Sequence, residues 1–192
     1  ILYGSTTRNG KGTLMETMLK VMGDYGSAAK PETIRAMRQK SGSAPNEDIA
    51  RLKDIRFVNM SEPDKGLIID SALVKTLTGQ DTIAVRKLYQ NSFNLVPKFK
   101  IFINTNYLPN IEDDTLFSSG RVIVIPFEHH FEDDEQDKNL KELFAQPENL
   151  SGILNWTLDG LRMLREEGLL IPQKVKDATA SYREDSDDIG NF

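Results

Sequence analysis

The residues best suited to chemistry form a glycine-rich stretch near the amino end. Gly10-Lys11-Gly12-Thr13 follows Gly4 and Asn9 and lies between a short apolar run and a helix-like pattern. In such a loop the backbone N–H groups turn toward an anion, and the lysine reaches the terminal phosphates. The amino end of the following helix adds a favourable dipole. The stretch therefore predicts a phosphate-binding loop that holds a nucleotide.

Two departures from the usual loop bear on its metal ligand. The spacing from Gly4 to Gly10 is one residue longer than in G-x-x-x-x-G-K, and Gly12 stands where a magnesium-binding Ser or Thr normally follows the lysine. Thr13 either takes over the magnesium or only touches a phosphate. The competing interpretation, a glycine-rich turn with an exposed lysine, fits the strand–loop–helix context less well.

Two polar side chains follow apolar runs that predict buried strands. Glu62 comes after residues 55–60, and Asn106 comes after residues 99–103. Because the carboxyl ends of parallel strands share one edge of a sheet, both are expected beside the phosphates. Glu62 would handle magnesium or polarise water, and Asn106 would orient the water or sense the γ-phosphate. The simpler alternatives are an exposed turn acid and an ordinary Asn-rich turn.

Arg121 precedes a further apolar run, residues 122–125. It is either a structural ion-pair partner or an arginine finger that neutralises charge on a transferred phosphoryl group. Sequence spacing alone leaves both open.

The elements that must position these residues alternate between strand-like and helix-like patterns. This predicts an α/β P-loop NTPase fold with a mostly parallel central sheet flanked by helices. We expect a P-loop core over residues 1–127 and a helical segment over 128–192 packed on it. Helices are expected at about 14–22, 46–53, 68–77, 135–146, 149–166 and 172–184, a β-hairpin at 82–96, and only a short helix within 24–45. Trp156 is interpreted as a packing residue of its helix.

Composition narrows the class of protein. The chain has 192 residues, no cysteine and two histidines, His129 and His130, which argues against a zinc enzyme. No apolar run approaches the length of a membrane span, so we expect a cytoplasmic protein. The chain begins at Ile1 without an initiator methionine, and we expect it to be a fragment of a larger protein.

Charge is unevenly distributed along this acidic chain of net charge −5. Four basic residues lie within fifteen positions that contain no acid, whereas residues 128–137 hold six acids and no Lys or Arg; the four are Arg86, Lys87, Lys98 and Lys100. The basic group either contacts nucleic-acid phosphates or is a solvated face. Tyr89 and Phe93 either stack on bases or, in at least one case, pack in the core.

The order of these motifs resembles the superfamily 3 helicase domain of phage and plasmid replicative primase–helicases, which is related to poxvirus helicase–primases and belongs to the AAA+ group. The resemblance covers nearly the whole chain and rests on Asn9 to Thr13, Arg51-Leu52, Ser61-Glu62, Lys75, Leu77 to Asp81, Arg86, Thr105-Asn106, Pro126-Phe127 and Gly152 to Trp156. The departures are Ser61, in place of the first acid of an Asp-Glu pair, and Gly120, where many relatives carry a second arginine.

The resemblance implies an ATP- and Mg²⁺-dependent DNA helicase motor of a phage- or plasmid-type replication protein in a bacterial host. It assigns Lys11 and Thr13 to the phosphate loop, Glu62 to the acidic motif, Asn106 to the γ-phosphate sensor and Arg121 to a finger supplied in trans. The motor would act as a ring, most simply a hexamer. The hairpin would enter its central channel and grip one DNA strand through Arg86, Lys87 and Lys98.

Two alternatives remain open at this point. A small P-loop nucleotide kinase also carries Gly-Lys-Gly-Thr, but it needs lid arginines, and the acidic 128–137 stretch offers none. A nucleotide-binding scaffold or loader with little hydrolysis is compatible with Gly12 and Ser61.

Overall fold

The computed structural model describes residues 1–36 and 47–187. Its centre is a five-stranded sheet in the order β2-β3-β6-β1-β7, and every neighbouring pair of strands is parallel. The strands are β1 (Leu2–Tyr3), β2 (Gly26–Ala29), β3 (Phe57–Ser61), β6 (Lys100–Thr105) and β7 (Ile125–Pro126). The predicted P-loop α/β architecture is confirmed.

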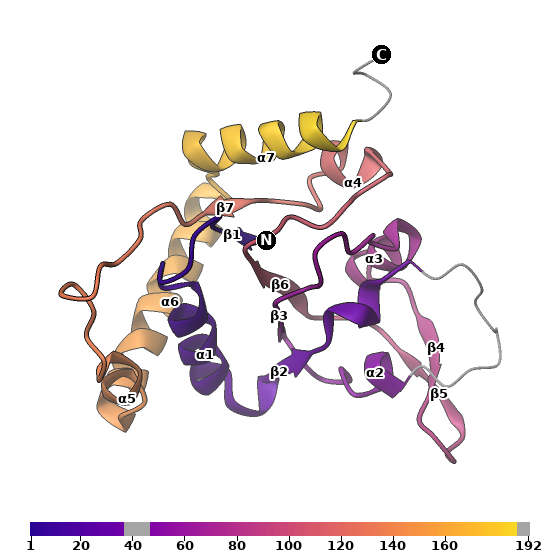
Figure 1. Cartoon of the computed structure of the whole chain (residues 1–192). Coiled ribbons are helices and arrows are strands. Elements are labelled where there is room, and N and C mark those ends of the chain that lie inside the picture. Colours follow the sequence, from indigo (N-terminus) through magenta and orange to yellow (C-terminus); the bar gives the residue numbers. More distant parts are fainter. Residues whose placement is uncertain (37–46, 188–192) are drawn as a thin grey trace.

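Helices cover both faces of this sheet (Figure 1). In Figure 1, α1 and α6 lie on one side, α2 and α3 lie on the other side with the hairpin, and α7 runs beside β7. The helices are α1 (Lys11–Met22), α2 (Glu47–Ala50), α3 (Ser71–Thr78), α4 (Thr115–Ser118), α5 (Leu140–Phe144), α6 (Pro147–Glu167) and α7 (Gln173–Ser186), with 3₁₀ turns η1 (Gly23–Tyr25) and η2 (Pro31–Ile34).

The alternation of side chains along the strands divides the core into two parts. Phe57 and Phe102 stack with ring centroids 4.6 Å apart, in the cluster that contains the apolar side of α1. Their neighbours Val58 and Ile103 belong instead to the larger cluster with α3, α4 and α7. Both faces of β3 and β6 are therefore buried, which holds their carboxyl ends in fixed positions.

The predicted hairpin is confirmed. Strand β4 (Ile83–Arg86) pairs antiparallel with β5 (Ser92–Leu95), and Val85 lies opposite Phe93. Val85 and Leu95 are buried in the main core, so the base of the hairpin is anchored to the domain while its turn, residues 87–91, extends outward (Figure 1).

Two strand predictions need correction. Residues 24–45 were expected to contain only a short helix, yet Gly26–Ala29 form β2 at the edge of the sheet. This strand is held by backbone pairing to β3 and carries small side chains, so it has no apolar signature. The run 122–125 contributes only its last residue to β7. The expected first residue of the helix at 46–53, Asn46, lies outside the described residues.

The interpretation of Trp156 as a packed core residue is wrong. Its side chain is 67% exposed, and α6 contains no fully buried residue. Helix α6 contacts α1 and α5, and several of its apolar side chains are exposed, among them Leu154, Leu158 and Met163. None of the helices in the described ranges is long and apolar enough to cross a membrane.

Candidate nucleotide-binding site

The glycine-rich stretch connects β1 to α1 at the carboxyl edge of the sheet, as a phosphate loop requires. Arg8 and Gly10 both have left-handed backbone conformations, with φ of 56° and 82°. The first hydrogen bond of α1 runs from the Leu14 N–H to the Gly10 carbonyl, so the N–H groups of the preceding turn have no acceptor inside the helix. These unpaired donors at a helix amino end form an anion-binding position.

Gly4 is required by close packing rather than by backbone conformation. A Cβ at this position would lie 2.3 Å from Asn9 Nδ2 and 2.4 Å from the carbonyl oxygen of Phe127. A Cβ at Gly12 would meet nothing within 4 Å. Gly4 and Gly12 therefore differ in what they contribute to the loop.

Lys11 is a buried cation whose hydrogen-bond partners are all uncharged. Its Nζ donates to Asn9 Oδ1 at 2.9 Å, to Asn106 Oδ1 at 2.9 Å and to the Gly4 carbonyl at 3.3 Å. The residue is 4% exposed, and burial lowers the pKa of its ammonium group. No carboxylate within the described residues forms an ion pair with Lys11. A desolvated positive charge without a counterion is stabilised when an anion such as a phosphate binds beside it.

Two asparagines hold Lys11 in place. Asn9 is buried. Its Nδ2 donates to the Thr6 carbonyl at 2.7 Å, and its Oδ1 accepts a hydrogen bond from Lys11 Nζ. Asn106 follows β6 directly. It is positioned by a turn in which the buried Thr105 hydroxyl accepts from the Tyr107 N–H at 2.9 Å and donates to the Tyr107 carbonyl at 2.6 Å. The structure thus brings together Gly4, Asn9, Lys11 and Asn106, which the sequence had grouped.

Sequence reasoning missed that the segment after β7 runs alongside the phosphate loop. The Phe127 N–H donates to the Tyr3 carbonyl at 2.6 Å, and the Phe131 N–H donates to the Arg8 carbonyl at 2.9 Å. His130 Nδ1 lies 2.8 Å from the Thr7 carbonyl. The acidic 128–137 stretch therefore flanks the loop, and backbone pairing of this kind leaves no side-chain pattern to find.

Glu62 lies immediately beyond β3 at the same edge of the sheet. Its backbone is left-handed, with φ of 55°, and its N–H donates to the Asn104 carbonyl of β6 at 2.9 Å. Its exposed carboxylate and the Thr13 hydroxyl are the oxygen donors that we expected to share magnesium. The described residues contain no cluster of three or more His, Cys, Asp or Glu side chains that would hold a metal by themselves.

Arg121 is not gathered with these residues. It precedes β7, and its Nη1 donates to Thr78 Oγ1 at 2.8 Å and to the Lys75 carbonyl at 3.4 Å, at the carboxyl end of α3. Lys75 is in turn paired with Asp113 at 2.6 Å, which lowers the pKa of that carboxyl to about 2. Arg121 therefore lies toward the amino edge of the sheet, away from the phosphate loop of its own chain.

The expected DNA-contacting residues are divided along the hairpin. Arg86 ends β4 and Lys87 begins the turn, whereas Lys98 lies between β5 and β6 near the base. Tyr89, in the turn, is 97% exposed, so its ring is free to stack on a base. Phe93 packs against the core with Lys53 Nζ 5.4 Å from its ring centroid, which confirms that one of the two aromatic residues is structural.

The parallel sheet, the glycine-rich loop and the buried lysine define a P-loop protein. A family model described as a family of unknown function (DUF5906) matches residues 2–121, and the chain belongs to this family. It is 32% identical over its whole length to "Putative helicase L207/L206" of Acanthamoeba polyphaga mimivirus. It is also 32% identical over 68% of its length to "Putative helicase 022R" of Frog virus 3. The chain spans 21% and 14% of these relatives.

Among solved structures, the fold is similar to that of the apo C-terminal region of NrS-1. The TM-score is 0.67 at 16% identity, and the match covers 95% of this chain and 41% of that one. A second apo structure of the region also gives 0.67, over 98% of this chain. The resemblance to helicase domains inferred from the motifs is confirmed by these relatives, and the P-loop fold is confirmed by the structures.

Gly4 and Gly12 provide a matched test of this geometry. We expect Gly4→Ala to lower the free energy of unfolding by about 1–3 kcal/mol, because the new methyl group must displace the Asn9 side chain and a backbone carbonyl. Gly12→Ala, which meets open space inside a helix, should raise it by up to about 1 kcal/mol. Denaturant unfolding of both variants measures the difference. Equal stabilities would mean that the loop does not pack as described.

Proposed function

We propose that this chain is the ATP-hydrolysing motor domain of a DNA helicase, active as part of a longer replication protein that assembles into a ring. The observation that carries the proposal is the buried Lys11 at the carboxyl edge of a parallel sheet, which donates to Asn9 and Asn106 and pairs with no carboxylate of the part of the chain that the structure describes. The sequence similarity to proteins named putative helicases supports a role in DNA unwinding and makes the nucleotide kinase alternative less favourable.

The chain's own residues would divide the reaction as follows. The loop N–H groups and Lys11 bind and orient the phosphates. Asn106, which faces Lys11, positions the γ-phosphate or the attacking water, and Glu62 polarises that water. Mg²⁺ would be held by Thr13 or Glu62 together with the phosphates, where it would neutralise charge on the transferred group.

Arg121 is proposed to act on the phosphate site of a neighbouring subunit. Its position supports this, because it lies away from Lys11 of its own chain and its guanidinium is exposed. The hairpin is proposed to contact single-stranded DNA through Arg86 and Lys87 at its turn and Lys98 near its base. The exposed Tyr89 ring would stack on a base.

Lys11→Ala and Glu62→Gln separate binding from hydrolysis. Lys11→Ala should weaken Mg-ATP binding by about 10–100-fold, because a charged hydrogen-bond donor to the phosphates is lost. Glu62→Gln should leave the affinity for ATP unchanged and slow hydrolysis by about 100-fold or more, since the amide keeps the shape but not the basicity. Calorimetry and phosphate release measure the two effects. Unchanged hydrolysis in Glu62→Gln would assign the general base to another residue, and Asp64 would be the next candidate.

A wild-type protein that binds ATP without DNA-stimulated turnover would favour the scaffold alternative.

Mixing experiments test the role of Arg121 in trans. In an assembly-competent longer protein, Arg121→Ala should bind ATP normally but hydrolyse it about a thousandfold more slowly, because the finger acts mainly in the transition state. Mixing it with Lys11→Ala subunits should restore part of the activity, since some interfaces then pair an intact loop with an intact arginine. Mixed rings that form and stay inactive at every ratio would favour a structural role beside Thr78.

Salt dependence tests the proposed DNA contacts. Lys87→Ala and Lys98→Ala should each reduce the slope of log affinity against log salt for single-stranded DNA by about 0.7, the value for one phosphate contact. Lys20→Ala, an exposed lysine of α1 on the other side of the sheet, serves as the control and should leave the slope unchanged. If the slope is the same in all three variants as in the wild type, Lys87 and Lys98 belong to a solvated face and do not contact DNA.

A further inference from the structure

The amino edge of the central sheet carries positive charge beside the hairpin. The Arg56 N–H donates to the Tyr25 carbonyl at 2.8 Å, and the Lys100 N–H donates to the Arg56 carbonyl at 2.9 Å. These three residues therefore lie side by side where β2, β3 and β6 begin. Neighbouring strands of a sheet are about 4.8 Å apart, so the three form a short row across the edge.

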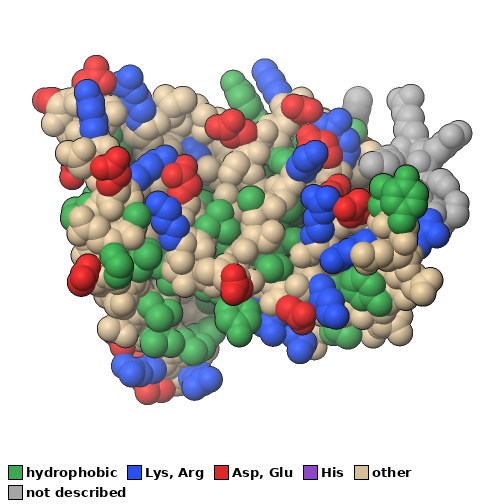
Figure 2. Space-filling model, turned by 90° about the horizontal axis from the view of Figure 1, so that it is seen from below, with side chains coloured by type: hydrophobic (Ala, Val, Ile, Leu, Met, Phe, Trp, Pro, Cys, Tyr) green, Lys and Arg blue, Asp and Glu red, His purple; other side chains and the backbone are tan. Residues whose placement is uncertain are grey.

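Two further lysines connect this row to the hairpin. Lys98 lies just before β6, and Lys53 Nζ lies 5.4 Å from the ring centroid of Phe93 in β5. Together these residues form what we call the amino-edge strip: Tyr25, Lys53, Arg56, Lys98 and Lys100. Figure 2 views the molecule from the side toward which the hairpin turn points, and it shows Lys and Arg side chains gathered on the hairpin half of that face. The strip thus continues the basic surface of the hairpin.

The four cations of the strip are available to an external anion. None of them forms an ion pair with a carboxylate in the part of the chain that the structure describes, and its three lysines are exposed. Arg56 Nη1 donates to the carbonyl oxygens of Asp54 and Ile55, at 2.9 and 3.1 Å, which fixes the guanidinium group at the edge. The acids that adjoin the strip in the sequence are Asp24 and Asp54, so the cations outnumber them.

Part of the strip is concave. Lys98 and Lys100 line a cavity of about 350 Å³ between α3 and the segment that leads into β6. Thr78 and Gln80 also line it, and none of its described lining residues is acidic. In a hollow of this kind the attraction of two ammonium groups for a phosphate is not offset by a carboxylate.

The aromatic ring of the strip is exposed among these charges. Tyr25 is 57% exposed, and the guanidinium carbon of Arg56 lies 5.8 Å from its ring centroid. Rings beside a positively charged groove bind unpaired bases of any sequence by stacking. Neither an acidic peptide nor an intact duplex presents a free base to such a ring. The strip therefore fits single-stranded nucleic acid best.

We propose that the amino-edge strip binds single-stranded nucleic acid, as a second contact beyond the hairpin turn. Its lysines and Arg56 bind phosphates of the backbone, and Tyr25 stacks on a base. The inference rests on the proposed function, because it extends the DNA path from the hairpin across the amino edge of the sheet. The phosphate loop is at the opposite, carboxyl edge, so the nucleic acid and the nucleotide do not compete for space.

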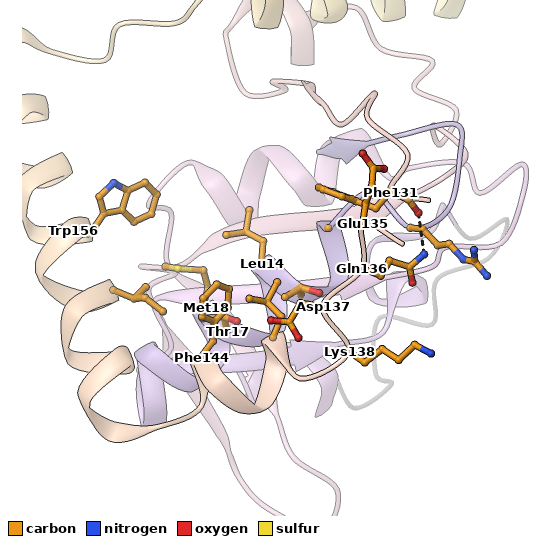
Figure 3. Close-up of a pocket in the computed structure, with 15 residues that line it drawn as sticks. Leu14, Thr17, Met18, Phe131, Glu135, Gln136, Asp137, Lys138, Phe144 and Trp156 are labelled. Atoms are coloured by element: carbon orange, nitrogen blue, oxygen red, sulfur yellow. Dashed lines mark hydrogen bonds between the residues drawn. The ribbon is translucent and has the colours of Figure 1, made fainter. Parts of the chain in front are cut away.

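Removal of charge tests the phosphate contacts. Binding of labelled oligothymidylate is measured by fluorescence anisotropy at several salt concentrations. Lys53→Ala/Lys100→Ala should reduce the slope of log affinity against log salt by about 1.4, since each lost phosphate contact contributes about 0.7. The matched control Lys20→Ala/Lys138→Ala removes two exposed lysines elsewhere and should leave the slope unchanged. Lys138 lines a different cavity, of about 690 Å³, beside the phosphate loop (Figure 3).

Removal of the ring tests the stacking contact. Tyr25→Ala should weaken oligothymidylate binding by about fivefold or more but keep the salt slope, because stacking involves no phosphate. Tyr25→Phe should bind as the wild type does. Tyr107→Ala is the matched control, because Tyr107 is 55% exposed and has Lys65 Nζ 5.4 Å from its ring centroid. It should change neither quantity. Circular dichroism checks the folding of each variant.

The outcomes separate this inference from the proposed function. If Lys87→Ala reduces the salt slope and the strip variants do not, DNA contacts only the hairpin, and the inference is wrong while the proposed function stands. Control variants that match the strip variants would reduce the effect to unspecific charge and overturn the inference. Polyglutamate that competes as well as oligothymidylate would make the partner an acidic peptide instead. A wild-type protein that does not bind oligothymidylate would overturn both proposals.

Discussion

The rest of the site depends on one buried positive charge that pairs with no carboxylate of the described residues. The Lys11 ammonium group is buried, and within the described ranges it donates hydrogen bonds only to neutral oxygens of Gly4, Asn9 and Asn106. This arrangement is costly without an anion and favourable with one, so the loop is organised for phosphate. It also explains the crowding at Gly4. The loop must fold back closely enough for the Gly4 carbonyl to reach Nζ, which leaves no room for a side chain.

The loop is also joined to the second half of the chain. The segment after β7 pairs with the loop through the Phe127 and Phe131 N–H groups, and the Arg8–Asp133 ion pair adds a charged contact. The same segment leads into α5 and α6, which line the cavity of about 690 Å³ beside the phosphate loop.

Residues with related proposed roles lie in separate places for a topological reason. A parallel sheet collects the ends of β1, β3 and β6 at one edge, which brings Lys11, Glu62 and Asn106 to the same side of the molecule. Arg121 precedes β7 and contacts the carboxyl end of α3, so it lies toward the other edge. The hairpin turn extends away from both. A complete catalytic site and a continuous DNA path would then require neighbouring subunits, in keeping with a ring.

The sequence by itself determined the phosphate loop, the strands that bury both faces, the hairpin and the helicase resemblance, because each depends on local spacing or on a run of apolar residues. Tertiary structure alone decided the rest. Strand β2 consists of small residues that are held by backbone pairing with β3. The segment after β7 is joined to the phosphate loop through main-chain N–H groups. Backbone contacts of these two kinds leave no pattern of side chains in the sequence. The exposure of Trp156 and the cavity beside α1 depend on how α6 packs against α1, which a helical period cannot specify. The neutral surroundings of Lys11 likewise arise from residues more than ninety positions apart, Lys11 and Asn106, meeting at one edge of the sheet.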